Sequence, residues 1–136
     1  MSSFLLPVQT AIYTRLTATI SAEVYDDPPG EPEGVPDANY PYVIIGLDQA
    51  EPWDTDDTLG AQVVATFHTW SRYEGKTEIK TAQGEIYDAL HRKAANLTAT
   101  GFRFVDCLHE FSEIFEENDG STRHGVCRYR LTVEKE

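Results

Sequence analysis

The chain has 136 residues, and its 23 Asp and Glu residues against 11 Lys and Arg residues give a formal charge of −12. That length predicts one domain spanning residues 1–136, and a 40% share of hydrophobic residues supports a core without disulfides. The negative balance argues against a protein that grips nucleic acid through a basic face, and the absence of a long apolar run or a signal-like N-terminus predicts a soluble cytosolic chain with no membrane partner.

The first segment carries apolar residues at helical spacing. A helix is predicted from about residue 6 to about residue 20, because one helical face collects Leu5, Val8, Ile12 and Leu16. A short strand over 22–25 is expected next. The following segment contains four prolines between Asp27 and Asp37, which predicts an exposed loop at about 27–39.

The middle of the chain predicts two long strands, at 40–47 and 61–72, since both runs are rich in β-branched and aromatic residues. The second run is apolar on both faces, which indicates a strand that is central or covered on both sides. The acidic, turn-rich segment between them predicts a loop at about 48–60. A second amphipathic helix is expected over 76–95, with Ile79, Ala82, Ile86 and Leu90 along one face.

A closing hairpin is predicted around the turn signal Asp119-Gly120. In the register that this turn sets, Cys107 faces Thr132, so Cys127 lies roughly 17 Å away along the strands at about 3.4 Å per residue. A disulfide needs Cα atoms within roughly 7 Å, and two buried free thiols are therefore expected. The element order predicts an α+β fold, with two helices flanking a mostly antiparallel sheet in the order α-β-β-β-α-β-β.

Motifs for catalysis or metal binding are missing from the sequence. No glycine-rich phosphate loop and no nucleophile elbow occurs. The stretch starting at Asp54 begins like a calcium loop, but its sixth position is Leu59 and its twelfth is Ala65. Cys107 and His109 share a strand face, although a structural zinc site needs four ligands. We therefore expect a protein that is not an enzyme and has no metal, cofactor or catalytic residues.

Two features indicate that the chain binds a protein partner. Trp53 stands in an otherwise acidic segment, where a large aromatic side chain is suited to anchor a neighbouring surface. The segments at 27–39 and 48–60 are long for so small a domain, and such loops are usually functional or disordered. These features indicate assembly, not turnover.

Nearly the whole chain carries an ordered set of motifs: QTAIYTRLTA near the start, then Val24-Tyr25-Asp26, Tyr40-Pro41-Tyr42-Val43, Trp53, His68-Thr69-Trp70-Ser71-Arg72, Gly75-Lys76, Asp119-Gly120 and Thr122-Arg123-His124-Gly125. With these motifs in this order, the sequence resembles the tail-completion or tail-terminator proteins, which join head and tail in bacteriophages with long non-contractile tails and in gene transfer agents. The step WSR-x-x-G-K and the terminal TRHG carry most of the resemblance.

The resemblance implies a structural virion protein with a small sheet and flanking helices, similar to tail-tube and other terminator proteins. Its copies would form a hexameric ring that caps the finished tail tube at the head-proximal end. The implied partners are further copies of itself, the tail tube protein and the head completion or connector protein, with DNA passing through the lumen without specific binding. Assembly would take place in the host cytoplasm.

The acidity of the chain suggests how DNA could pass such a ring, because acidic walls repel phosphates. Lumen candidates are Asp54, Asp56 and Asp57, or the acidic strand end at 113–117. Trp53 is a candidate contact to the adjacent subunit or the tube. Arg72 and Arg123 are candidates for pairing with carboxylates of a neighbour, with an ordinary pair within the chain as the alternative. Trp70 is expected in the core beside Phe67.

Two other classes of function remain open. The first is a monomeric acidic adaptor or tail-assembly chaperone that binds one virion partner, and its sequence would look the same. The second is a metal-dependent hydrolase, which requires a site that the sequence does not display.

Overall fold

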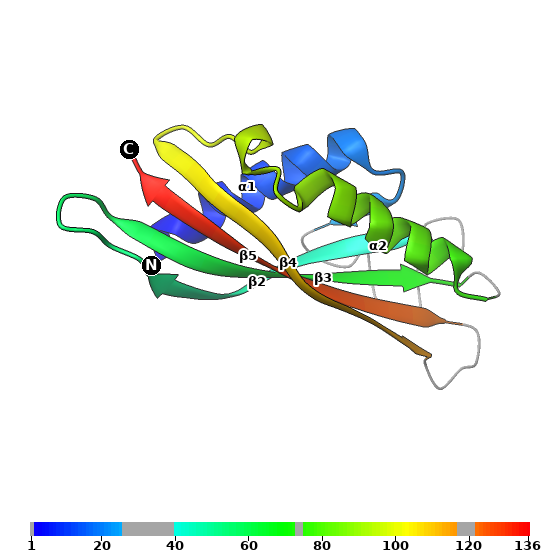
Figure 1. The fold of residues 1–136 in the computed structure, drawn as a ribbon. Coiled ribbons are helices and arrows are strands. Elements are labelled where there is room, and N and C mark those ends of the chain that lie inside the picture. The colour runs from blue at the N-terminus through cyan, green and yellow to red at the C-terminus, as the bar shows by residue number, and fades with distance from the viewer. Residues whose placement is uncertain (1, 26–39, 73–74, 117–121) are drawn as a thin grey trace.

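A computed structural model describes residues 2–25, 40–72, 75–116 and 122–136 of the chain (Figure 1). The proline-rich segment at 27–39 and the Asp119-Gly120 turn lie outside the described residues. The elements in chain order are α1 (Ser2–Thr19), β1 (Glu23–Tyr25), β2 (Tyr42–Pro52), β3 (Gly60–Ser71), α2 (Thr77–Leu90), the short 3-10 helix η3 (Ala94–Asn96), β4 (Phe102–Glu116) and β5 (Arg123–Lys135).

The described strands form one five-stranded sheet in the order β1-β2-β3-β5-β4. Only β1 and β2 pair in parallel, and the other neighbours are antiparallel. The α+β fold with a mostly antiparallel sheet is thus confirmed, and β3 lies at its centre as expected. Figure 1 shows both helices on the same face, where α1 contacts β1 and β2 while α2 contacts β3, β5 and β4.

The core lies between this face of the sheet and the two helices. Alternate residues of the central strands point into it and are fully buried, among them Val63, Phe67, Tyr129 and Leu131. Helix α1 adds the stripe predicted from its spacing, with Val8, Ile12 and Leu16 completely buried. The helices cover one face of the sheet. For this reason the residues of β3 alternate between buried and half-buried in the second half of the strand.

The opposite face of the sheet, called the open face below, has no described helix over it. Trp70 lies on this face and is half-buried, so the expectation that it packs in the core beside Phe67 is wrong. The two residues are three positions apart in one strand, and an odd separation places their side chains on opposite faces. Trp70 instead stacks on His124, with ring centroids 3.9 Å apart.

Three element boundaries differ by several residues from the sequence expectation. Helix α2 ends at Leu90 instead of residue 95, because His91 takes an extended backbone conformation. Helix α1 begins at Ser2, so Pro7 lies inside the helix and removes one backbone hydrogen bond. Strand β2 continues through a bulge between Leu47 and Gln49 and pairs with β3 as far as Pro52. The acidic loop expected at 48–60 is therefore only the short tip at 53–59, because cross-strand pairing overrides the turn-rich composition.

The β4–β5 hairpin keeps the predicted register near its turn and loses it farther away. Phe115 faces His124 as the turn requires, but two bulges in β4 each shift the register by one residue. Cys107 therefore faces Leu131 instead of Thr132, and Cys127 faces Ser112. Both cysteines are buried and free, as expected.

Candidate interaction surfaces

Residues 53–59 form the hairpin tip, an ordered extension of strands β2 and β3. The Trp53 N–H donates to the carbonyl of Gly60 at 2.9 Å, and the Thr55 N–H donates to the carbonyl of Thr58 at 2.8 Å. The carboxylate of Asp54 accepts the N–H of Gly60 at 2.9 Å. These bonds make the tip a continuation of the sheet.

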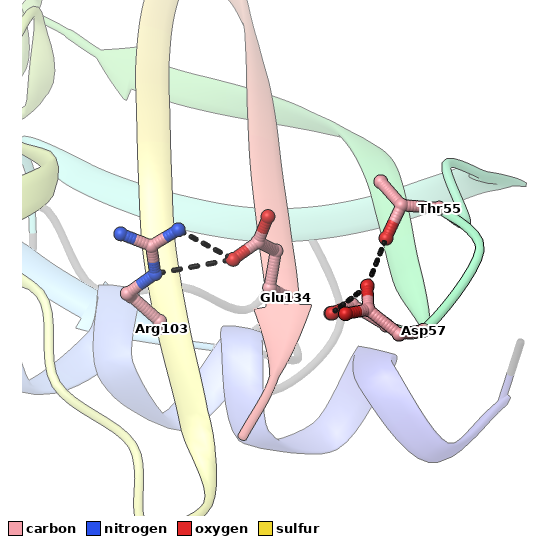
Figure 2. A network of polar contacts seen from close by, with 5 residues as sticks. Thr55, Asp57, Arg103 and Glu134 are labelled. Carbon is pink, nitrogen blue, oxygen red and sulfur yellow. Dashed lines mark hydrogen bonds and ion pairs between the residues drawn. The ribbon is translucent and has the colours of Figure 1, made fainter.

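The three acidic side chains predicted for the lumen all lie on this tip and are exposed. Asp57 Oδ1 accepts hydrogen bonds from the hydroxyls of Thr55 and Thr58 at 3.3 Å each (Figure 2). Asp54 and Asp57 thus shape the turn, whereas Asp56 makes no hydrogen bond to the described residues.

Trp53 is 38% exposed and lies against the strand beside it. A Cβ at Gly60 would stand 2.4 Å from the Trp53 carbonyl oxygen and 3.1 Å from its ring, so only glycine fits there. Gly60 pairs with Glu134, which makes an ion pair with Arg103 on β4 at the same end of the sheet (Figure 2). More than a third of the surface of Trp53 is thus available for a partner.

Arg72 and Arg123 lie at the other end of the sheet, because Ser71 pairs with Arg123 while Gly60 pairs with Glu134. The Arg72 guanidinium stands 4.8 Å from the centre of the Tyr40 ring, and its Nε donates to Thr122 Oγ1 at 3.3 Å. The structure therefore does not bring the two arginines together with the hairpin tip.

Arg123 has a contact with Glu116, whose Oε1 lies 3.8 Å from its Nε. Its side chain is only 13% exposed, and its Nε and Nη1 have no hydrogen-bond acceptor among the described residues. Both arginines thus contact residues of their own chain, and Arg123 does so through a carboxylate.

The thiols of the chain are poorly suited to chemistry. Burial raises the pKa of Cys127 to about 12, and burial together with the nearby Asp106 raises the pKa of Cys107 to about 12.

Across the described residues, no three His, Cys, Asp or Glu side chains are grouped so as to hold a metal ion. None of the described helices is long and apolar enough to cross a membrane.

The structure exposes further apolar side chains that were not singled out from the sequence: Leu6 (69%), Phe115 (45%), Tyr13 (44%), Tyr87 (42%), Val105 (41%) and Leu108 (38%). Leu6 and Tyr13 are two helical turns apart, a spacing that could have identified them as a second apolar stripe on α1. Val105 could not have been found from spacing, because it is displaced by a bulge.

The outer edge of β4 is partly closed by its own chain. The Arg92 N–H donates to the carbonyl of Cys107 at 2.8 Å, and the His109 N–H donates to Nδ1 of His91 at 3.0 Å. Gln83 Nε2 donates to the carbonyl of Glu113 at 3.2 Å. These bonds occupy backbone groups that an added strand would need.

The chain is similar to known proteins over most of its length. The family model described as "Tail completion protein gp17" matches residues 10–134. The chain belongs to the gp17 family of tail completion proteins. It is 30% identical over 97 residues to tail completion protein gp17 of Bacillus phage SPP1, covering 71% of this chain and 70% of that protein.

The fold is also found in a solved structure titled "Virion of native gene transfer agent (GTA) particle". The TM-score is 0.77 at 22% identity, with 94% of this chain and 95% of that chain covered. The family resemblance drawn from the sequence is therefore confirmed, and this gp17 family member has the structural role of a tail completion protein of the virion.

Proposed function

We propose that copies of this gp17 family member form a ring, a hexamer, that closes the completed tail tube at its head-proximal end. The ring joins the tail to the head connector, and the genome passes through its lumen. The observation that carries the proposal is the family match over residues 10–134. We also propose that assembly occurs in the host cytoplasm, with the tail tube protein and the head completion protein as partners.

The shape of the chain suits a closed ring. Ring contacts are heterologous, so each copy must offer two different surfaces that meet the neighbours on either side. The two edges of the sheet carry different elements, α1 with β1 on one side and β4 with α2 on the other. The projecting hairpin tip adds a place for contact with a neighbouring copy or the tube through Trp53.

The charge suits a conduit for DNA, because six copies at −12 each carry a formal −72. Either Asp54, Asp56 and Asp57 or the acids of β4 near 113–117 line the lumen in this proposal. The two groups lie at opposite ends of the sheet, since Gly60 and Glu116 pair with opposite ends of β5. Reversal of one group to Lys while the other stays intact therefore tests each location separately, and unchanged DNA delivery in both variants would argue against an acidic lumen.

The ring itself is tested by native mass measurement over a wide range of protein and salt concentration, followed by mixing with preformed tail tubes and imaging the tube ends. A closed hexamer, or density confined to one tube end, supports the proposal. A monomer that ignores tubes under every condition would replace it with the adaptor or assembly chaperone.

A further inference from the structure

We propose that the outward surface of α1 is one half of the contact between neighbouring subunits, and that it binds a second copy of this chain. This surface, called the α1 face, consists of Leu6, Thr10, Tyr13, Thr14 and Thr17, all of which are exposed. The inference rests on the proposed ring and states which surfaces close it.

The α1 face is uncharged in a chain where 25% of residues are charged. Helix α1 has no acidic residue along Ser2–Thr19, and Arg15 is its one basic residue. The Nε of Arg15 donates to the carbonyl of Ala89 at 2.9 Å, which directs this charge toward α2. By contrast, α2 exposes Tyr87 beside the charged residues Lys80 and Asp88.

The α1 face also carries two large apolar side chains among its threonines. Leu6 is 69% exposed and Tyr13 is 44% exposed, one above the other on the helix. Both side chains line a groove between α1 and β1 together with Gln9, Thr10, Val24 and Tyr25. Depletion of charge with an aromatic side chain present is the composition of an interface core.

The occupant that this surface favours is another copy of the same chain. Two copies at −12 each repel, and a contact half without charge adds nothing to this repulsion. A basic partner would instead favour the acidic tip or the acidic end of β4. A contact whose α1 half bears no charge therefore fits a like-charged neighbour, because no carboxylate of the neighbour meets a carboxylate on α1.

The complementary half lies at the opposite edge of the sheet. A heterologous contact requires a different patch there, and β4 exposes Val105 at 41% and Leu108 at 38%. We call these two residues the β4 patch. The backbone beside it is already bonded to His91 and Arg92, so the neighbour contacts the β4 patch with side chains and does not add a strand.

The first test is a charge substitution on the α1 face. The double variant Leu6→Asp with Tyr13→Asp should raise the protein concentration needed for ring formation by about tenfold or more, because it places buried charge in the contact. Lys80→Asp on α2 makes the same change in net charge away from the contact and should leave assembly unchanged. Far-ultraviolet circular dichroism checks that both variants are folded.

The second test gives a positive signal that does not depend on the folding of the charged variants. Thr10→Cys and Leu108→Cys in one chain, treated with a flexible bis-maleimide, should yield a ladder of cross-linked oligomers. The pair Thr10→Cys with Thr81→Cys on α2 should give none. The native cysteines are buried and should not react.

The outcomes separate this inference from the proposed function. If the unmodified chain forms rings while the charged variant assembles normally and the Thr10–Leu108 pair yields no ladder, other surfaces close the ring and this inference is overturned. If the charged variant forms rings that no longer bind tubes, α1 contacts the tube, which also overturns it. If the unmodified chain forms no ring even on tubes, the proposed function itself fails.

Discussion

Identical residue types have different roles in this chain, depending on their bonding. Asp54 and Asp56 are both exposed acids of the hairpin tip, but only Asp54 accepts a backbone hydrogen bond, from Gly60. The sequence places both in an acidic segment and cannot rank them. The difference in hydrogen bonding between Asp54 and Asp56 arises only in the folded turn.

We expect Asp54→Ala to lower the free energy of unfolding by about 1 kcal/mol, because the Gly60 N–H loses its acceptor. Asp56→Ala should change it by less than about 0.5 kcal/mol, as is typical of exposed side chains without partners. Urea denaturation of the two variants measures the difference. Equal effects would mean that the hydrogen bond to Gly60 contributes nothing to stability.

Because burial raises the pKa of both thiols, we expect the free energy of unfolding to fall at high pH. Their native pKa of about 12, raised by burial, lies above the value of about 8.5 expected in the unfolded chain. The unfolded chain therefore releases these protons first, so stability is fully present below about pH 8.5 and falls as the pH rises toward 12.

Denaturation at a series of pH values from about 8 to 11 checks this. In Cys107→Ala with Cys127→Ala, the baseline stability should be lower but the alkaline decline shallower. At neutral pH the native chain should resist alkylation by iodoacetamide, and rapid labelling without denaturant would show that the thiols are accessible.

At the scale of elements, the sheet depends on close contact between α2 and β5. Gly125 lies on β5 beneath α2, and a Cβ there would stand 2.6 Å from Gln83 Nε2 and 3.0 Å from Ile79 Cδ1. Gln83 in turn donates to the carbonyl of Glu113 at the edge of β4. Gly125 thus leaves the space that the side chains of Gln83 and Ile79 fill beneath α2.

Gly125→Ala should destabilise the fold by about 1–3 kcal/mol through this overpacking. Gly84→Ala is the matched control, because a Cβ at Gly84 meets nothing within 4 Å and alanine favours the helix by up to about 1 kcal/mol. Thermal unfolding should therefore move in opposite directions for the two variants. A shift of the same sign would contradict the close contact at Gly125.

At the scale of the whole molecule, net charge opposes assembly. Copies at −12 repel one another in solution, and salt screens this repulsion by shortening the Debye length from about 30 Å at 0.01 M to about 8 Å at 0.15 M. The α1 face has no charges whose attraction to a neighbour salt could screen, so salt does not weaken a contact through this face.

We therefore expect the fraction of chains in rings to rise with salt, measured by sedimentation or native mass at fixed protein concentration. The prediction discriminates between two contacts, because ion pairs from Arg72 and Arg123 to a neighbour would weaken as salt increases. A fall in ring population with salt would favour those arginines over the α1 face.

The sequence alone determined the helices, the central strand and the register beside the final turn, because hydrophobic spacing and turn chemistry act over a few residues. It also determined the family, through motifs spread in order along the chain. The bulges in β4, the extension of β2 to Pro52 and the position of Trp70 on the open face were decided by the tertiary structure, since each depends on pairing or cover by distant segments. The candidate site divides in the same way. The sequence singled out Trp53 and its acidic neighbours and predicted the buried stripe of α1, whereas the exposure of Leu6 and Tyr13 depends on which segments pack beside that helix.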